Sequence, residues 1–140
     1  MKTTKINYID KYGYKITAEY NKYDKLVKKT SYQSDGNIYY INEYNENEKI
    51  IKQIGYDFDG QTIDYIEEYD NGTIDKITYY NDDETIMCIN EYNDIGEIIE
   101  VTHYNPDGTI DYIDDYDDDD DDDDDDDYDY NDDEEDGDDK

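Results

Sequence analysis

The sequence predicts an all-β fold, an antiparallel meander of about nine short strands in a single-layer or curved sheet, followed by a disordered acidic tail. Three observations lead to this prediction: a tyrosine at about every twelfth residue, a turn rich in glycine, asparagine and aspartate after each one, and an isoleucine-rich segment between turns. The 140 residues include 20 tyrosines but only 22 isoleucines, leucines and valines. This supply fits one domain at most and is too small for a thick two-layer core.

The N-terminal part, residues 1–30, contains degenerate basic repeats. It holds eight lysines against three acidic residues, a net charge of +5. Asp24 takes the place of a turn glycine before Leu26, and Tyr12 takes that place in the first copy. We therefore expect these copies to form a degenerate or capping end of the repeat array.

Residues 31–116 carry the twelve-residue repeats. Each unit runs from a recurring tyrosine through a turn to two aliphatic positions and the next tyrosine. The recurring tyrosines, the earlier ones included, are Tyr8, Tyr20, Tyr32, Tyr44, Tyr56, Tyr69, Tyr80, Tyr92, Tyr104 and Tyr116. The turn glycine four residues later is Gly36, Gly60, Gly96 or Gly108, with Gly72 in a shortened loop and Glu84 as an exception.

Each turn has a local physical basis. In the segment 104–108, Pro106 presets φ near −65°, Asn105 and Asp107 can bond to the nearby backbone, and Gly108 accepts a positive φ. The residues between turns are rich in isoleucine, tyrosine and threonine, which favour strands. Connections of about four residues are too short for a parallel crossover, so neighbouring strands should be antiparallel.

The aliphatic spacing conflicts with an ideal strand. Ile38 and Ile41 are three residues apart, as are Ile74 and Ile77, so they would point to opposite faces. Two solutions are open: a β-bulge in each strand, or a sheet with apolar residues on both faces. Either sheet would depend on cross-strand tyrosine and isoleucine pairs, each contributing about 0.2–1 kcal/mol.

The C-terminal part, residues 117–140, is predicted to be a disordered tail. Residues 117–127 are eleven consecutive aspartates, and a run of like charge without apolar partners stays solvated. A solubilising role is the leading interpretation. Weak Ca²⁺ binding at Asp117, Asp118, Asp119 and Asp120 and docking onto basic proteins are the alternatives.

The charge and hydropathy exclude several functional classes. The formal net charge of −32 disfavours nucleic acids and anionic membrane surfaces, whereas basic partners would be attracted. The longest apolar run is the four residues 86–89, so we expect no membrane insertion and no signal peptide, and an intracellular location by default. One cysteine excludes an intramolecular disulfide.

Two segments resemble known repeat families. The segment 92–101, Tyr-Asn-Asp-Ile-Gly followed by aliphatic residues at two offsets, resembles the YD repeats of Rhs-type and teneurin-type shells. The segment 104–116 is similar to the tandem repeats of a domain of unknown function found in phytoplasmas. The first resemblance implies a β-rich surface for encapsulation, adhesion or carbohydrate contact. The second implies an uncharacterised repeat protein.

Catalytic groupings are not evident in the sequence. We interpret His103, the single histidine, as a surface or rim residue, and Cys88 as a small buried apolar filler. The carboxylates are too numerous for any pair to stand out. We therefore expect no enzyme, no cofactor and no metal site apart from the weak Ca²⁺ alternative.

Tyrosine is the residue type that suggests a function. The periodic tyrosines fit a structural role, so the off-period Tyr39, Tyr65, Tyr79 and Tyr112 are the better contact candidates. The leading hypothesis is a protein-interaction module that uses a β-repeat surface. The alternatives are a carbohydrate-binding or adhesion fragment and an acidic-tail binder of Ca²⁺ or basic proteins.

Overall fold

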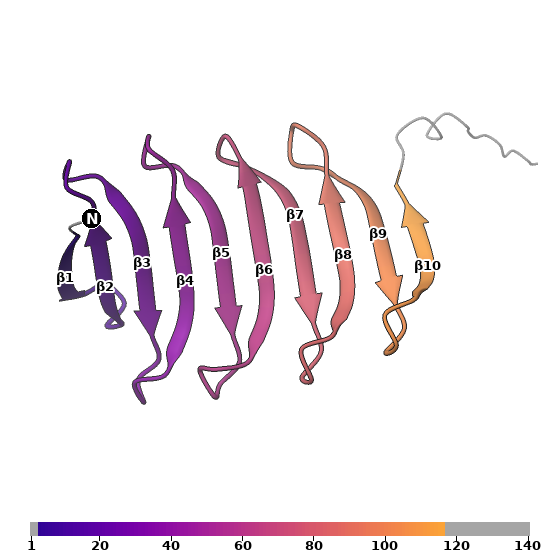
Figure 1. Ribbon diagram of the computed structural model, residues 1–140, viewed down its shortest axis with the longest axis horizontal. Helices are drawn as coiled ribbons and strands as arrows, with labels where there is room; N and C mark the ends of the chain where they lie inside the picture. The colour runs from indigo at the N-terminus through magenta and orange to yellow at the C-terminus, as the bar shows by residue number, and fades with distance from the viewer. Residues whose placement is uncertain (1–2, 117–140) are drawn as a thin grey trace, which may run out of the picture.

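The computed structural model describes residues 3–116 and shows ten strands in one open antiparallel sheet. The strands follow one another in chain order, from β1 at one end to β10 at the other (Figure 1). They are β1 (Thr4–Ile9), β2 (Lys15–Tyr20), β3 (Leu26–Tyr32), β4 (Ile38–Tyr44), β5 (Ile50–Tyr56), β6 (Ile63–Asp70), β7 (Thr73–Tyr80), β8 (Ile86–Tyr92), β9 (Ile98–Tyr104) and β10 (Ile110–Asp115). The predicted all-β meander is confirmed, with ten strands in place of about nine because every recurring tyrosine has its own strand.

The predicted tail, residues 117–140, lies outside the described residues. The same holds for the Ca²⁺ candidates Asp117, Asp118, Asp119 and Asp120. Within residues 3–116, no helix is long and apolar enough to cross a membrane.

The turns repeat one hydrogen-bond pattern. The Asn105 N–H donates to the Thr109 carbonyl at 2.8 Å, and the Gly108 N–H donates to the Asn105 carbonyl at 2.9 Å. Gly108 has a φ of 92°, the left-handed conformation that glycine adopts without a Cβ clash. The same two bonds recur in most of the other loops, so the turn explanation from the sequence is confirmed.

Two details of the turns differ from the prediction. Glu84 adopts a φ of 72°, but it is not the single exception, because Glu48 holds the same place at 62°. In the first hairpin the left-handed residue is Gly13, at 91°, and not Tyr12. The turn sits one residue later there, and the β1–β2 pairing accordingly has no bulge.

A β-bulge resolves the three-residue isoleucine spacing. In the β3–β4 pair, Tyr32 lies opposite Ile38 and Ser31 lies opposite Tyr40, so Tyr39 is the extra residue. Ile41 then lies opposite Thr30, which puts both isoleucines of β4 on one face. A register shift occurs in eight of the nine pairings, so the bulged-strand alternative is confirmed.

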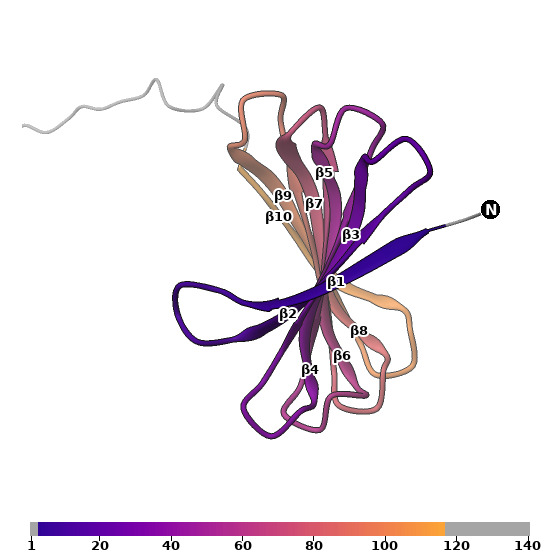
Figure 2. The same ribbon diagram turned by 90° about the vertical axis from the view of Figure 1, so that its left-hand side faces the viewer.

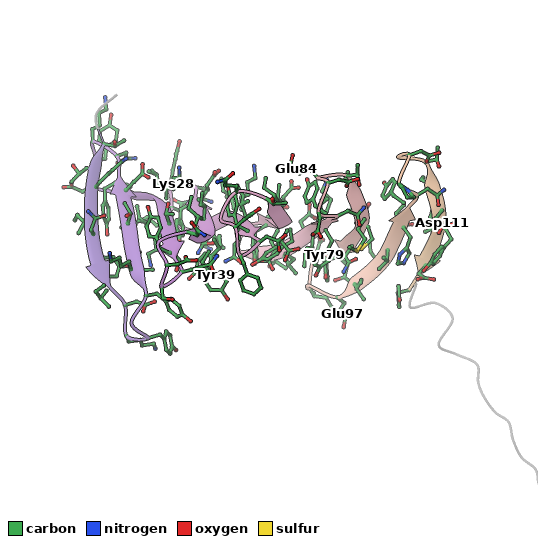
Figure 3. All side chains as sticks on the ribbon, turned by 90° about the horizontal axis from the view of Figure 1, so that it is seen from below. Lys28, Tyr39, Tyr79, Glu84, Glu97 and Asp111 are labelled. Atoms are coloured by element: carbon green, nitrogen blue, oxygen red, sulfur yellow. The ribbon has the colours of Figure 1, made fainter. Side chains whose placement is uncertain are left out.

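The sheet is a single twisted layer over the described residues. Its strands fan progressively around the long axis, as expected for strands with a right-handed twist (Figure 2). Side chains project from both faces without a second layer above either (Figure 3). Only Ile16, Ala18 and Val101 are buried apolar residues in residues 3–116, so cross-strand neighbours must supply most of the packing.

We predict that Glu84→Gly raises the free energy of unfolding by about 0.5 kcal/mol. Glycine removes the cost of the left-handed conformation, and the larger entropy of the unfolded chain offsets part of that gain. Urea denaturation measures the change. Asp82→Gly, in the same loop, is the control and should lower stability, whereas equal effects of the two substitutions would contradict the explanation.

Candidate functional site

The strand register sorts side chains into rows that run across the sheet. Residues directly opposite each other on paired strands point to the same face, so a chain of such pairs forms one row. One row on one face is rich in aromatic residues. A row on the other face consists of charged side chains.

The aromatic row consists of Tyr40, Tyr65, Tyr79, His103 and Tyr112. The pairings that join it are Tyr40–Gly55, Gly55–Tyr65, Tyr65–Tyr79, Tyr79–Cys88, Cys88–His103 and His103–Tyr112. From β4 to β10 it spans about 29 Å at the usual strand spacing. Three of the four contact candidates from the sequence therefore share one row.

Tyr65 and Gly55 depend on each other. A Cβ on Gly55 would lie 2.0 Å from Cε1 of Tyr65, so the tyrosine ring lies directly over the glycine backbone. The Tyr65 hydroxyl donates to Gln53 Oε1 at 2.7 Å, which anchors the far end of the ring. The ring of Tyr79 follows, with its centroid 6.5 Å from that of Tyr65 and tilted by 46°. The middle of the row is thus a packed aromatic surface.

Tyr39, the fourth candidate, joins the row from its bulged position. Its ring centroid lies 5.2 Å from that of Tyr40 and 6.0 Å from that of Tyr14. Tyr39 is 46% exposed and lines a shallow hollow of about 500 Å³ together with Tyr14 and Phe58. The bulge therefore extends the row towards β2 without adding a strand.

The C-terminal end of the row brings three polar residue types together. The His103 ring stacks on Tyr112, with centroids 4.2 Å apart and a 15° angle between planes. His103 Nε2 lies 3.3 Å from Asp114 Oδ2, and Cys88 lies opposite His103 in the register. Thiol, imidazole and carboxylate are the groups of a cysteine nucleophile site. Burial, however, raises the pKa of the Cys88 thiol, which works against a thiolate.

The phenols of this face have shifted acidities. Burial, with a smaller effect of Glu67, raises the pKa of Tyr65 to about 12. Burial also raises the pKa of Tyr79, and burial together with a hydrogen bond to Glu67 raises that of Tyr69. These phenols stay neutral at physiological pH. The hydroxyls of Tyr65 and Tyr69 already donate to Gln53 and Glu67, so towards a bound partner they can act only as hydrogen-bond acceptors.

The opposite face carries a charge ladder. It is a row of ten ionisable side chains, one per strand, that alternate in sign over the first eight. In strand order they are Lys5, Glu19, Lys28, Glu43, Lys52, Glu68, Lys76, Glu91, Glu100 and Asp115. Ion pairs of 4.0 Å and 3.8 Å are formed by Lys28 with Glu19 and by Lys76 with Glu68. The alternation fails at Glu100, where a lysine would continue it.

Metal binding has no site among the described residues. In residues 3–116, no three histidine, cysteine, aspartate or glutamate side chains are grouped closely enough to hold a metal ion.

Sequence reasoning missed two features of the site. Cys88 is half-buried and not a buried filler, and its position opposite His103 follows from the register alone. The charge ladder had a signal in the sequence, because Lys28, Lys52 and Lys76 are spaced by 24 residues, two repeats apart. His103 is partly exposed at the surface, as expected.

We predict that Gly55→Ala lowers the free energy of unfolding by about 2 kcal/mol, because the new methyl group would displace the Tyr65 ring. A double-mutant cycle in urea tests the cause. In a Tyr65→Ala background, Gly55→Ala should lower the free energy of unfolding by much less. Additive effects of the two substitutions would show that the glycine serves some other purpose.

We predict that stability falls with rising pH between pH 10 and pH 12. In the unfolded chain the tyrosine loses its proton near pH 10, whereas the raised pKa of folded Tyr65 keeps that proton on up to about pH 12. Between these values only the unfolded state is deprotonated, which favours unfolding. The stability that the protonated phenol provides is therefore complete below pH 10 and is lost as the pH rises to about 12. Chemical denaturation along a pH series measures the slope. Tyr65→Phe should make that slope shallower, and an unchanged slope would refute the assignment.

Comparisons with solved structures show where this sheet recurs. The Glycosylation Associate Protein (Gap123) complex from Streptococcus agalactiae is 21% identical, with a TM-score of 0.53, over 74% of this chain and 19% of that chain. The structure of accessory secretory protein 1, 2 and 3 from Streptococcus pneumoniae is 19% identical, with a TM-score of 0.50, over 73% of this chain and 19% of that chain. TarM is 10% identical, with a TM-score of 0.51, over 69% of this chain and 19% of that chain. The chain spans about a fifth of these neighbours, and the likeness concerns the fold.

No curated protein sequence matches the chain. One family does, in three overlapping segments at residues 2–50, 32–79 and 79–123, which together cover most of the sequence. The overlapping segments agree with the tandem repeats, and the chain belongs to the family described as Protein of unknown function (DUF2963).

Proposed function

We propose that this repeat protein is a non-enzymatic protein-interaction module whose contact surface is the aromatic row. The observation that carries the proposal is the alignment of Tyr40, Tyr65, Tyr79, His103 and Tyr112 in one register row on an uncovered sheet face. Tyrosine offers a large amphipathic contact area and loses little conformational entropy on binding.

The charge around the row favours a basic partner. Residues 31–113 carry three lysines and 20 acidic residues, a net charge of −17. On the row's own face, Glu67 and Asp114 lie two residues along their strands from Tyr65 and Tyr112, opposite Gln53 and Val101. Complementary charge would speed association and select basic segments. A neighbour with the same type of sheet is described as part of a complex, which supports a protein partner.

Adjacent tyrosines on opposite faces provide the test. Tyr79 lies in the aromatic row, whereas Tyr80 is the next residue and points to the other face. We expect Tyr79→Ser to reduce the recovery of specific partners in quantitative pull-downs by at least about fivefold and Tyr80→Ser to leave it unchanged. Equal recovery with both variants, each checked for folding by circular dichroism, would remove the aromatic row as the contact surface.

The non-enzymatic part of the proposal rests on the Cys88 region. Burial raises the pKa of the Cys88 thiol. The His103 ring stacks on Tyr112, and its Nε2 atom lies against the carboxylate of Asp114. A nucleophilic cysteine needs the opposite shift. Alkylation with iodoacetamide should therefore give a pH midpoint above 9.0, the ordinary value for this thiol. A midpoint below that value would favour a reactive site.

Carbohydrate binding is the second candidate. The stacked rings of His103 and Tyr112 form a flat platform, and Tyr112 is 51% exposed. Flat aromatic surfaces can stack against the apolar faces of sugars, which agrees with the resemblance to YD repeats. A glycan array with Tyr112→Ala as the control tests it. Signals equal to those of the control would eliminate this candidate.

The acidic tail provides the third candidate, a binder of Ca²⁺ or basic proteins. Its support is the sequence alone, eleven consecutive aspartates. Titration calorimetry with Ca²⁺ or with a basic protein, on chains with and without residues 117–140, separates it from the sheet. Equal heats from both chains would reject the tail as the binding segment.

A further inference from the structure

The two terminal strands have free edges. Within residues 3–116, β1 pairs only with β2 and β10 pairs only with β9, so each presents one unpaired row of backbone N–H and C=O groups (Figure 1). Such an edge is a template for another strand unless the protein blocks it. The eight strands between them are paired on both sides.

The aliphatic side chains of both terminal strands are exposed. Ile6 on β1 is 48% exposed and Ile113 on β10 is 50% exposed. Ile41 and Ile89 hold the place of Ile113 in earlier repeats, and they are half-buried because each has strands on both sides. A strand added at either end would cover side chains that the fold leaves uncovered.

The two edges carry opposite charge. Lys5 lies on β1, and Lys11 and Lys15 lie at or next to the following turn. At the other end, Asp114 and Asp115 lie on β10. The charge ladder thus begins with a lysine at one edge and ends with an aspartate at the other.

We propose that copies of this chain associate head to tail, with β10 of one copy pairing antiparallel with β1 of the next. The register places Lys5 opposite Asp115. The same register places Tyr8 opposite Tyr112, since three residues forward on β1 correspond to three residues back on β10. Both new pairs fit existing rows, because Lys5 belongs to the charge ladder and Tyr8 shares the face of Ile16 and the aromatic row.

The geometry of the sheet permits this pairing. Strand directions alternate, so β1 of the next copy occupies the position of an eleventh strand and runs antiparallel to β10. The same faces then continue from copy to copy. The contact joins two different surfaces and does not close, which gives linear assemblies and not a symmetric dimer. It goes beyond the proposed function, because it uses the strand edges, and it extends the aromatic row by Tyr8 without covering the face of that row.

Disulfide trapping tests the direction and the register. In a Cys88→Ala background, one preparation carries Lys5→Cys and another carries Asp115→Cys. Opposed residues on antiparallel strands have Cα atoms about 4.5–5.5 Å apart, within the range of a disulfide. The mixture should give a cross-linked dimer under mild oxidation, and each preparation alone should give little. The proposal would be overturned if one preparation alone gave as much cross-linked dimer as the mixture, or if the mixture gave none.

A charge exchange tests the same contact without a cross-link. Lys5→Glu should weaken self-association in sedimentation equilibrium by about fivefold, since like charges then lie opposite each other. The double variant Lys5→Glu with Asp115→Lys should restore it. Lys52→Glu reverses a ladder charge in an interior strand and should leave self-association unchanged. Failure of the double variant to recover, or a wild-type chain that stays monomeric, would refute the pairing.

Discussion

The register with one extra residue in almost every strand is the constraint on which the rest of the structure depends. Without the bulge, Ile38 and Ile41 would point to opposite faces. With Tyr39 as the extra residue, both lie on the face that holds Tyr32 and Thr30. Each periodic tyrosine from Tyr20 to Tyr104 consequently lies opposite the first aliphatic residue of the next strand, as Tyr32 lies opposite Ile38. These mixed pairs replace the core that the composition does not provide.

Stability in such a sheet is local and additive. A side chain gains contacts from strands on either side, so each interior strand contributes in a similar way and the terminal strands contribute less. The charge ladder adds little at each step, because Lys28 and Lys76 are partly exposed and solvent screens their ion pairs. Its larger effect is on register, since a shift by one residue would send its charges to the aromatic face.

The tyrosine period and the turn residues were sufficient to predict the strands and their direction, and they left a bulge in each strand as one of two solutions. The period located every strand, since each recurring tyrosine lies at or next to a strand end. The contact candidates were chosen for lying off the period, and the register later put Tyr65, Tyr79 and Tyr112 in one row. The proximity of Cys88 and His103 could not be predicted, because it requires the pairing of β8 with β9 including the bulge.

The failure of the charge alternation links the two ends of the sheet. Glu91, Glu100 and Asp115 lie on three successive strands at the end where β10 has no outer neighbour. Like charges directly opposite each other are unfavourable, so this end of the ladder lacks a cation. At the other end, Lys5 has a single acidic neighbour, Glu19, and could pair with a second. Head-to-tail pairing satisfies both requirements with one contact, because it gives Asp115 a lysine and Lys5 a second carboxylate.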